Sequence, residues 1–131
     1  MKTYWVYAGS ERDLTKIGVS ANILGRMQTL QAGRENPLHF RFTRIGEDRA
    51  FAFTVERFTH YRLHHRRLHG EWFSVSGKEA SRAIRAAHRY LLSRVEAGAT
   101  RDEILKIVDG CRQRDVGKKR RADASRQSAA A

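Results

Sequence analysis

Residue types that can cleave phosphodiester bonds occur together in the first 60 residues of this chain. Arg26 could hold a phosphate through two hydrogen bonds, or neutralise the charge that develops in a transition state. Glu56 offers a carboxylate to a divalent cation, and His60, four residues later, could accept a proton. Tyr4 and Tyr7 add two phenols on a short aromatic segment. Each residue alone also fits an ordinary surface or core position, but the set indicates metal-assisted phosphodiester cleavage.

The charge balance indicates a polyanionic partner. Lys and Arg number 26 against 14 Asp and Glu, which gives a formal net charge of +12. Such an excess is typical of proteins that bind nucleic acid; DNA is the first choice and RNA the alternative. No apolar run approaches the ~20 residues that span a bilayer, and the first residues lack a signal-peptide pattern. We therefore expect a cytoplasmic protein with no membrane partner and no obligate protein partner.

The apolar periodicity predicts an α/β fold with a small antiparallel sheet of about three strands, flanked by helices. Residues 3–8 and 15–19 are apolar runs around a polar turn, as in a β-hairpin. Leu38, Phe40 and Phe42 alternate with polar residues and predict a third strand. Residues 72–75 are expected to be extended. Helices are predicted from Ser20, as N-cap, to about Gln31, from about Asp48 to Leu68, and from the capping box Ser76–Glu79 to about residue 96, with Ile84, Leu91 and Val95 facing inward.

The composition changes after about residue 96. Residues 1–96 are expected to form one domain, and residues 97–110 a short helix that opens with a second capping box, Thr100–Glu103. Residues 111–131 hold seven Lys or Arg, two Asp and the single Cys111, with no apolar period. This composition predicts a disordered basic tail. Four of its residues are expected to attract the nucleic-acid backbone: Lys118, Lys119, Arg120 and Arg121.

The helix predicted from about Asp48 to Leu68 carries a polar face opposite its apolar one. Glu56, His60, His64 and Arg67 are spaced by four, four and three residues and would share that face. Arg67 is a further candidate for nucleic-acid contact. A solvated face with one Glu–His pair is the alternative reading. Zinc is disfavoured because no cysteine lies near and the arginines would repel a cation, so Mg²⁺ or Mn²⁺ on Glu56 fits better.

The order of these motifs resembles the GIY-YIG nuclease superfamily over about residues 2–76. The closest likeness is to its phage and bacterial branch, the Orf172-type or Mug-type DNA-binding domains, in which the second motif reads Lys-Ile-Gly. The resemblance rests on the following residues: Lys16-Ile17-Gly18-Val19-Ser20, Arg26, Leu30-Gln31, Glu56 with His60, and Gly70-Glu71-Trp72-Phe73. It implies a GIY-YIG-like fold that binds one divalent cation.

The resemblance also implies a role for each matched residue. Arg26 corresponds to the catalytic arginine, Glu56 to the metal-binding glutamate, and His60 to the histidine that this branch carries. Tyr4 matches the first functional tyrosine, with Tyr7 as second choice. Lys16 falls where many members have the second tyrosine, so it could hold phosphate or act as a base.

The sequence therefore predicts a DNA-binding protein with metal-dependent endonuclease activity. A non-catalytic DNA-binding module of the same fold is the main alternative, because the second tyrosine is replaced, and an RNA-binding protein is the third. Glu71 is expected to pack and cap beside Trp72 and Phe73 rather than to take part in the chemistry.

Overall fold

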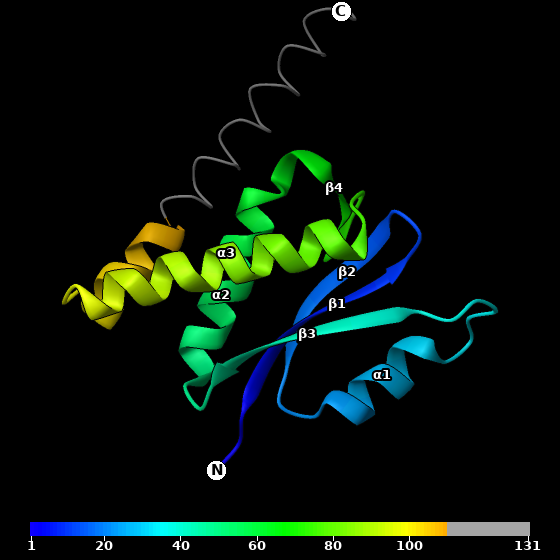
Figure 1. Cartoon of the computed structure of the whole chain (residues 1–131), viewed down its shortest axis with the longest axis horizontal. Helices are drawn as coiled ribbons and strands as arrows, with labels where there is room; N and C mark the ends of the chain where they lie inside the picture. The colour runs from blue at the N-terminus through cyan, green and yellow to red at the C-terminus, as the bar shows by residue number, and fades with distance from the viewer. Residues whose placement is uncertain (110–131) are drawn as a thin grey trace, which may run out of the picture.

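The computed structural model describes residues 1–109, and its strands form one five-stranded antiparallel sheet (Figure 1). The strand order is β3-β1-β2-β5-β4. The strands are β1 (Tyr4–Glu11), β2 (Leu14–Ser20), β3 (His39–Gly46), β4 (Arg67–His69) and β5 (Trp72–Phe73). The α/β prediction is confirmed, although the sheet has five strands rather than about three, because two short strands extend it beyond β2.

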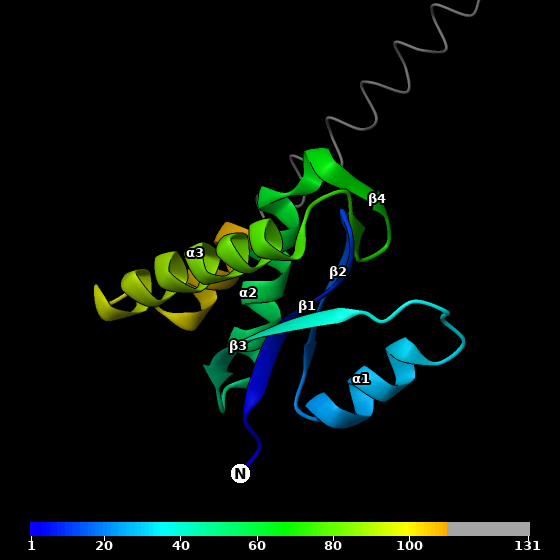
Figure 2. The ribbon, with the colours of Figure 1, turned by 45° about the vertical axis from the view of Figure 1, so that its right-hand side comes forward.

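Three α-helices are joined to this sheet, and they lie on different sides of it. They are α1 (Ile23–Gln31), α2 (Arg49–Arg62) and α3 (Gly77–Glu96), and residues 101–109 are also helical. Helices α2 and α3 lie together on one side, while α1 lies apart from them across the strands (Figures 1 and 2). The sheet therefore has a face closed by α2 and α3 and a second face on the side of α1.

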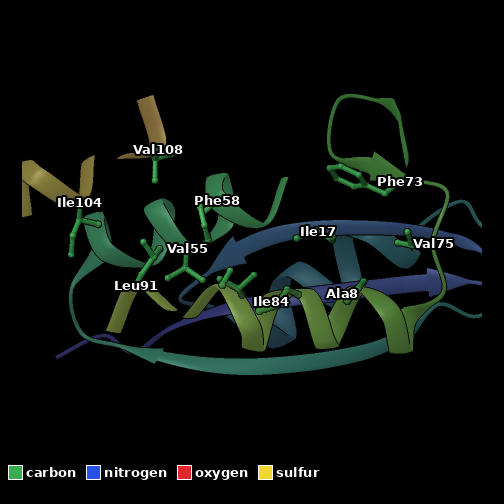
Figure 3. Close-up of a cluster of buried hydrophobic side chains, with 13 residues drawn as sticks. Ala8, Ile17, Val55, Phe58, Phe73, Val75, Ile84, Leu91, Ile104 and Val108 are labelled. Carbon is green, nitrogen blue, oxygen red and sulfur yellow. The ribbon is translucent and has the colours of Figure 1, made fainter. Parts of the chain in front are cut away.

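Side-chain alternation along the strands defines the two faces. Val6, Ala8 and Ile17 point to α2 and α3 and are fully buried. They pack with Val55 of α2 and Ile84 of α3 in one mainly aliphatic core, which also holds Phe58 and Phe73 (Figure 3). Neighbouring residues of each strand point the other way, and this second set is called the open face. Its members are Trp5, Tyr7 and Gly9 of β1, Lys16, Gly18 and Ser20 of β2, Phe40, Phe42 and Arg44 of β3, and Trp72 of β5.

Helix α1 starts later than the sequence predicted. Ser20 still pairs with Trp5 in the β-ladder, so it cannot serve as the N-cap. Asn22 takes that role, and its side-chain oxygen accepts a hydrogen bond from the amide of Gly25 at 3.1 Å. No residue of α1 is buried, so this helix sits over the sheet without closing it.

Helix α2 begins as expected, at the Asp48 cap, but ends at Arg62 instead of Leu68. A 3-10 turn, His64–Arg66, follows, and the chain then folds back as β4 and β5. The helix stops here because the chain pairs with itself instead. The amide of Ser74 donates to the carbonyl of Arg66 at 2.7 Å, and Gly70, with φ +55°, makes the turn between them. Leu68, where the helix was expected to end, lies instead in β4 and is 56% exposed.

The helices that start after Ser76 and Thr100 have the predicted caps, but the packing of Val95 differs from the prediction. The Ser76 hydroxyl accepts from the amide of Glu79, and Thr100 and Glu103 exchange hydrogen bonds at 3.2 and 3.3 Å. Val95, predicted to face inward, is 41% exposed because it lies in the last turn of α3, beyond the sheet. The predicted tail, with Cys111, lies outside the described residues.

Candidate active site

The ring of Tyr7 extends from β1 across the neighbouring strand at Gly18. The two residues are partners in the β1–β2 ladder. A Cβ atom at position 18 would lie 2.4 Å from the Tyr7 hydroxyl oxygen and 2.6 Å from Cζ. Only a glycine leaves room for the phenol in this position. Tyr7 is 3% exposed, and its ring runs over Gly18. The hydroxyl group therefore lies toward the outer side of β2, the side that faces away from β1.

The outer side of β2 receives His60 and Glu56 from α2. The Nε2 atom of His60 lies 2.9 Å from the carbonyl oxygen of Ile17, and because a carbonyl only accepts, Nε2 carries the proton. Glu56 precedes His60 by one helical turn, and its Oε1 lies 3.8 Å from that Nε2. Burial lowers the pKa of His60, which favours the neutral imidazole. His60 therefore fastens α2 to β2 and fixes Glu56 beside the strand.

Glu71 reaches the same edge from the turn between β4 and β5. Its carbonyl oxygen accepts a hydrogen bond from the amide of Ile17 at 3.0 Å, which pins the residue beside β2. Its carboxylate lies 4.0 Å from the ammonium group of Lys16. Glu71 belongs to the site, although the sequence analysis assigned it to packing.

The carboxyl group of Glu56 is perturbed by burial and by its neighbour Glu71. Burial, followed by the negative charge of Glu71 and a hydrogen bond that protonated Glu56 donates to the Glu71 carboxylate, raises the pKa of Glu56 to about 8. Glu56 is 7% exposed, whereas the side chain of Glu71 is 43% exposed, so Glu56 is the desolvated member of the pair. In the absence of a cation, the raised pKa favours the protonated form of Glu56 at neutral pH.

Arg26 brings positive charge to the Tyr7 hydroxyl from α1. Burial raises the pKa of Tyr7 to about 12; the charge of Arg26 opposes that rise, and Glu71 and Glu56 add to it. All three charges therefore act on one phenol, although they come from α1, the turn before β5 and α2. Arg26 itself is exposed, so its guanidinium is free to meet a ligand.

Trp72 and Lys16 extend the site onto the open face. They are ladder partners, and the Lys16 ammonium lies 5.9 Å from the Trp72 ring centroid. The guanidinium of Arg34 lies 4.7 Å from the same ring. Both cations are held by the indole, and Lys16 remains 22% exposed.

The structure thus brings together Tyr7, Lys16, Arg26, Glu56 and His60 of the residues that the sequence singled out. Tyr4 stands apart: it opens β1 opposite Gly46, three residues and ~10 Å along the strand from Tyr7. Arg67 begins β4 rather than extending α2, and its Nε donates to the carbonyl of Gly70 at 2.7 Å. Lys118, Lys119, Arg120 and Arg121 lie outside the described residues.

Two features of the sequence could have indicated the roles of Tyr7 and Glu71 in the site. The turn Arg12-Asp13 has two residues, which sets Glu11 opposite Leu14 and consequently Tyr7 opposite Gly18. That register selects Tyr7 over Tyr4. The signal for Glu71 is weaker, because only its place between Gly70 and Trp72 marks it before the fold is known.

The donor set fits a divalent cation that needs few protein ligands. Residues 1–109 contain no group of three or more His, Cys, Asp or Glu placed to hold a metal ion. Mg²⁺ is commonly held by one or two carboxylates, with water and phosphate oxygens as its other ligands. Glu56 and Glu71 offer two carboxyl groups close enough to share a proton, a place that a cation can take instead.

Comparison with known families assigns the chain. The model of the T5orf172 domain matches residues 3–88, and the chain belongs to this family. T5orf172 is a phage-associated domain related to GIY-YIG-like families of nucleases and DNA-binding proteins. Neither the search of curated proteins nor that of solved structures gives a match. Within residues 1–109 no helix combines the length and apolarity needed to cross a membrane.

Proposed function

We propose that the chain is a metal-dependent DNA endonuclease of the GIY-YIG type. One observation carries this proposal: the Tyr7 phenol crosses Gly18 to an edge where Arg26, Glu56 and Glu71 all act on it. A phenol, a guanidinium and two neighbouring carboxyl groups, of which Glu56 is buried, can supply the proton donor, the charge stabilisation and the metal ligands for phosphodiester hydrolysis. The net charge of +12 supports a nucleic acid as substrate.

Each charged residue has a role in this proposal. The guanidinium of Arg26 holds a phosphate oxygen and offsets the negative charge that grows during attack on phosphorus. Lys16, positioned by Trp72 and Glu71, binds a second phosphate oxygen. Glu56, with Glu71 beside it, would hold the Mg²⁺ or Mn²⁺ ion. Such an ion polarises the phosphate and stabilises the leaving oxygen.

Tyr7 and His60 take parts that differ from those expected from the sequence. With a pKa of about 12, Tyr7 keeps its proton at neutral pH and acts as a hydrogen-bond donor that orients water or phosphate. The Nε2–H of His60 is committed to the Ile17 carbonyl, so His60 positions α2 instead of accepting a proton at that atom.

Plasmid nicking in Mg²⁺ or Mn²⁺ tests the proposal. The wild-type chain should nick DNA, and Glu56→Gln should reduce the rate by about 10²-fold or more, on the scale seen when single transition-state contacts are removed. DNA binding should persist, because the change removes a negative charge near phosphate. Glu96→Gln is the matched control, since Glu96 is an exposed carboxylate at the end of α3. Equal nicking by Glu56→Gln and the wild type would refute the assignment.

A non-catalytic DNA-binding module is the second candidate, and Lys16 is the observation that favours it. Lysine stands where many GIY-YIG nucleases have a second tyrosine, and it is paired with Glu71 at 4.0 Å. A wild-type chain that binds DNA but cleaves none in either metal would establish this alternative.

A further inference from the structure

The open face of the sheet gathers aromatic rings that the aliphatic core does not use. Tyr7, Phe40 and Phe42 form a continuous row, with ring centroids 6.5 and 6.0 Å apart. Phe40 and Phe42 are nearly parallel, with an interplanar angle of 7°. Trp5 and Trp72 lie on the same face. Phe42 is 36% exposed, which leaves part of a large apolar ring in water.

Helix α1 leaves an open groove beside this row. The groove has a volume of about 470 Å³ and is lined by Met27, Gln28, Gln31, Ala32, Leu38 and Phe40. No residue of α1 is itself buried, and Phe42, which stacks on Phe40, keeps 36% of its surface exposed. An exposed aromatic surface of this kind marks a binding site more often than it marks the outside of a monomer.

The basic side chains around the aromatic row are Lys16, Arg26, Arg34 and Arg44, and Arg44 is exposed opposite Trp5. Two acids near the row are paired with bases. Glu71 lies 4.0 Å from Lys16; Glu11, at the end of β1 far from Trp5, lies 3.4 Å from Arg34 and accepts from the Asn36 amide at 2.8 Å. The row is therefore suited to a ligand that combines flat rings with negative charge.

We propose that the open face binds unpaired DNA, with bases stacked on Phe42 and Phe40 and with phosphates on Arg44, Arg26 and Lys16. In duplex DNA the bases are stacked on one another, so their faces are not available to a protein ring. An unpaired strand exposes those faces, and aromatic rings beside a basic groove bind it without sequence preference. The inference deepens the proposed function, because it implies a substrate with single-stranded character beside the scissile phosphate.

Binding to an oligothymidylate of about 15 nucleotides in EDTA tests the inference without any need for cleavage. The wild type should bind this strand more tightly than a duplex of equal length. Phe42→Leu keeps an apolar side chain on β3 but removes the ring, and it should weaken single-strand binding on the order of 10-fold. Phe42→Trp should restore affinity. The loss with Phe42→Leu should persist at high salt, where backbone attraction is screened.

Tyr90→Ala is the matched control. Tyr90 is 43% exposed and stacks on Phe58, a residue of the closed side, with ring centroids 5.4 Å apart. This substitution should leave single-strand affinity unchanged. Circular dichroism of each variant separates lost binding from lost folding.

Tryptophan emission gives a second readout. The two tryptophans of the chain, Trp5 and Trp72, both lie on the open face, so the single strand should quench their emission. The inference is overturned by equal affinities for single strand and duplex, by unchanged emission on binding, or by Phe42→Leu behaving like Tyr90→Ala. Nicking that persists with any of these results would leave the nuclease assignment standing. Single-strand binding without nicking would support this inference and count against the nuclease assignment.

Discussion

The two faces of the sheet are built from the same strands but from different kinds of residue. The closed face holds Val6, Ala8 and Ile17, all fully buried against aliphatic side chains of α2 and α3. The open face holds aromatic rings and cations, and its helix, α1, has no buried residue of its own. Because alternate residues of one strand serve the two faces, the closed face can fix strand positions while the open face meets a ligand. Within each strand, one set of alternate residues stabilises the fold and the other set is available to bind a ligand.

The largest expected effect is on the closed face. Ile84 is 1% exposed in the aliphatic core, so Ile84→Ala should lower the free energy of unfolding by about 2–5 kcal/mol. Phe42→Leu, on the open face, should cost about 1 kcal/mol or less. Urea denaturation of both variants gives the comparison. A similar loss from both would mean that the open face is part of the folding core, and the division between the faces would fail.

A substitution at Gly18 sharpens the comparison on the open face. Gly18→Ala places a Cβ at 2.4 Å from the Tyr7 hydroxyl oxygen, so the phenol must move. A displacement of about 1 Å at a reacting group can cost 10²-fold in rate, and we expect nicking to fall on that scale. Tyr7→Phe removes the hydroxyl group through which Gly18→Ala is expected to lower the rate, although Cζ of the ring would still lie 2.6 Å from the new Cβ. The double variant should therefore lose less than the product of the two single losses; full activity of Gly18→Ala would contradict the proposed place of Tyr7.

The smallest effect concerns Glu56, which lies at the border between the faces. Its pKa is raised from 4.5 to about 8, so the folded state binds its proton more tightly than the unfolded state does. Stability from this source is fully present below pH 4.5 and is lost as the pH rises through about 8. Melting temperatures of the metal-free chain should fall over that range by several degrees, and Glu56→Gln should flatten the decline. Glu96→Gln should leave the decline as it is.

The local patterns of the sequence predicted much of the fold. The hairpin of β1 and β2, the start of α2 near Asp48 and the Thr100–Glu103 capping box follow from nearest neighbours in the chain. Helix α2 was predicted six residues too long, since the Glu-His-His-Arg spacing continues past Arg62. Its true end depends on pairing between residues 66 and 74, which local periodicity does not report.

The site was predictable in its residue types and less so in its geometry. Lys16, Arg26, Glu56 and His60 carry a recognisable motif, and the fold brings them together. The part of Glu71 depends on the return of β5 to the edge of β2, a contact between segments about 55 residues apart. The preference for Tyr7 over Tyr4 depends on strand register, which a motif match alone does not fix.

The peptide unit at Ile17 has a consequence for how this protein can change over evolutionary time. Its amide donates to the carbonyl of Glu71 and its carbonyl accepts from His60, while its side chain is buried in the core. Every residue type except proline offers the same amide and carbonyl. Among substitutions at this position, only proline would therefore remove one of these two hydrogen bonds. Lineages are thus free to exchange one aliphatic residue for another at position 17, and the placement of Glu71 and His60 will be inherited unchanged.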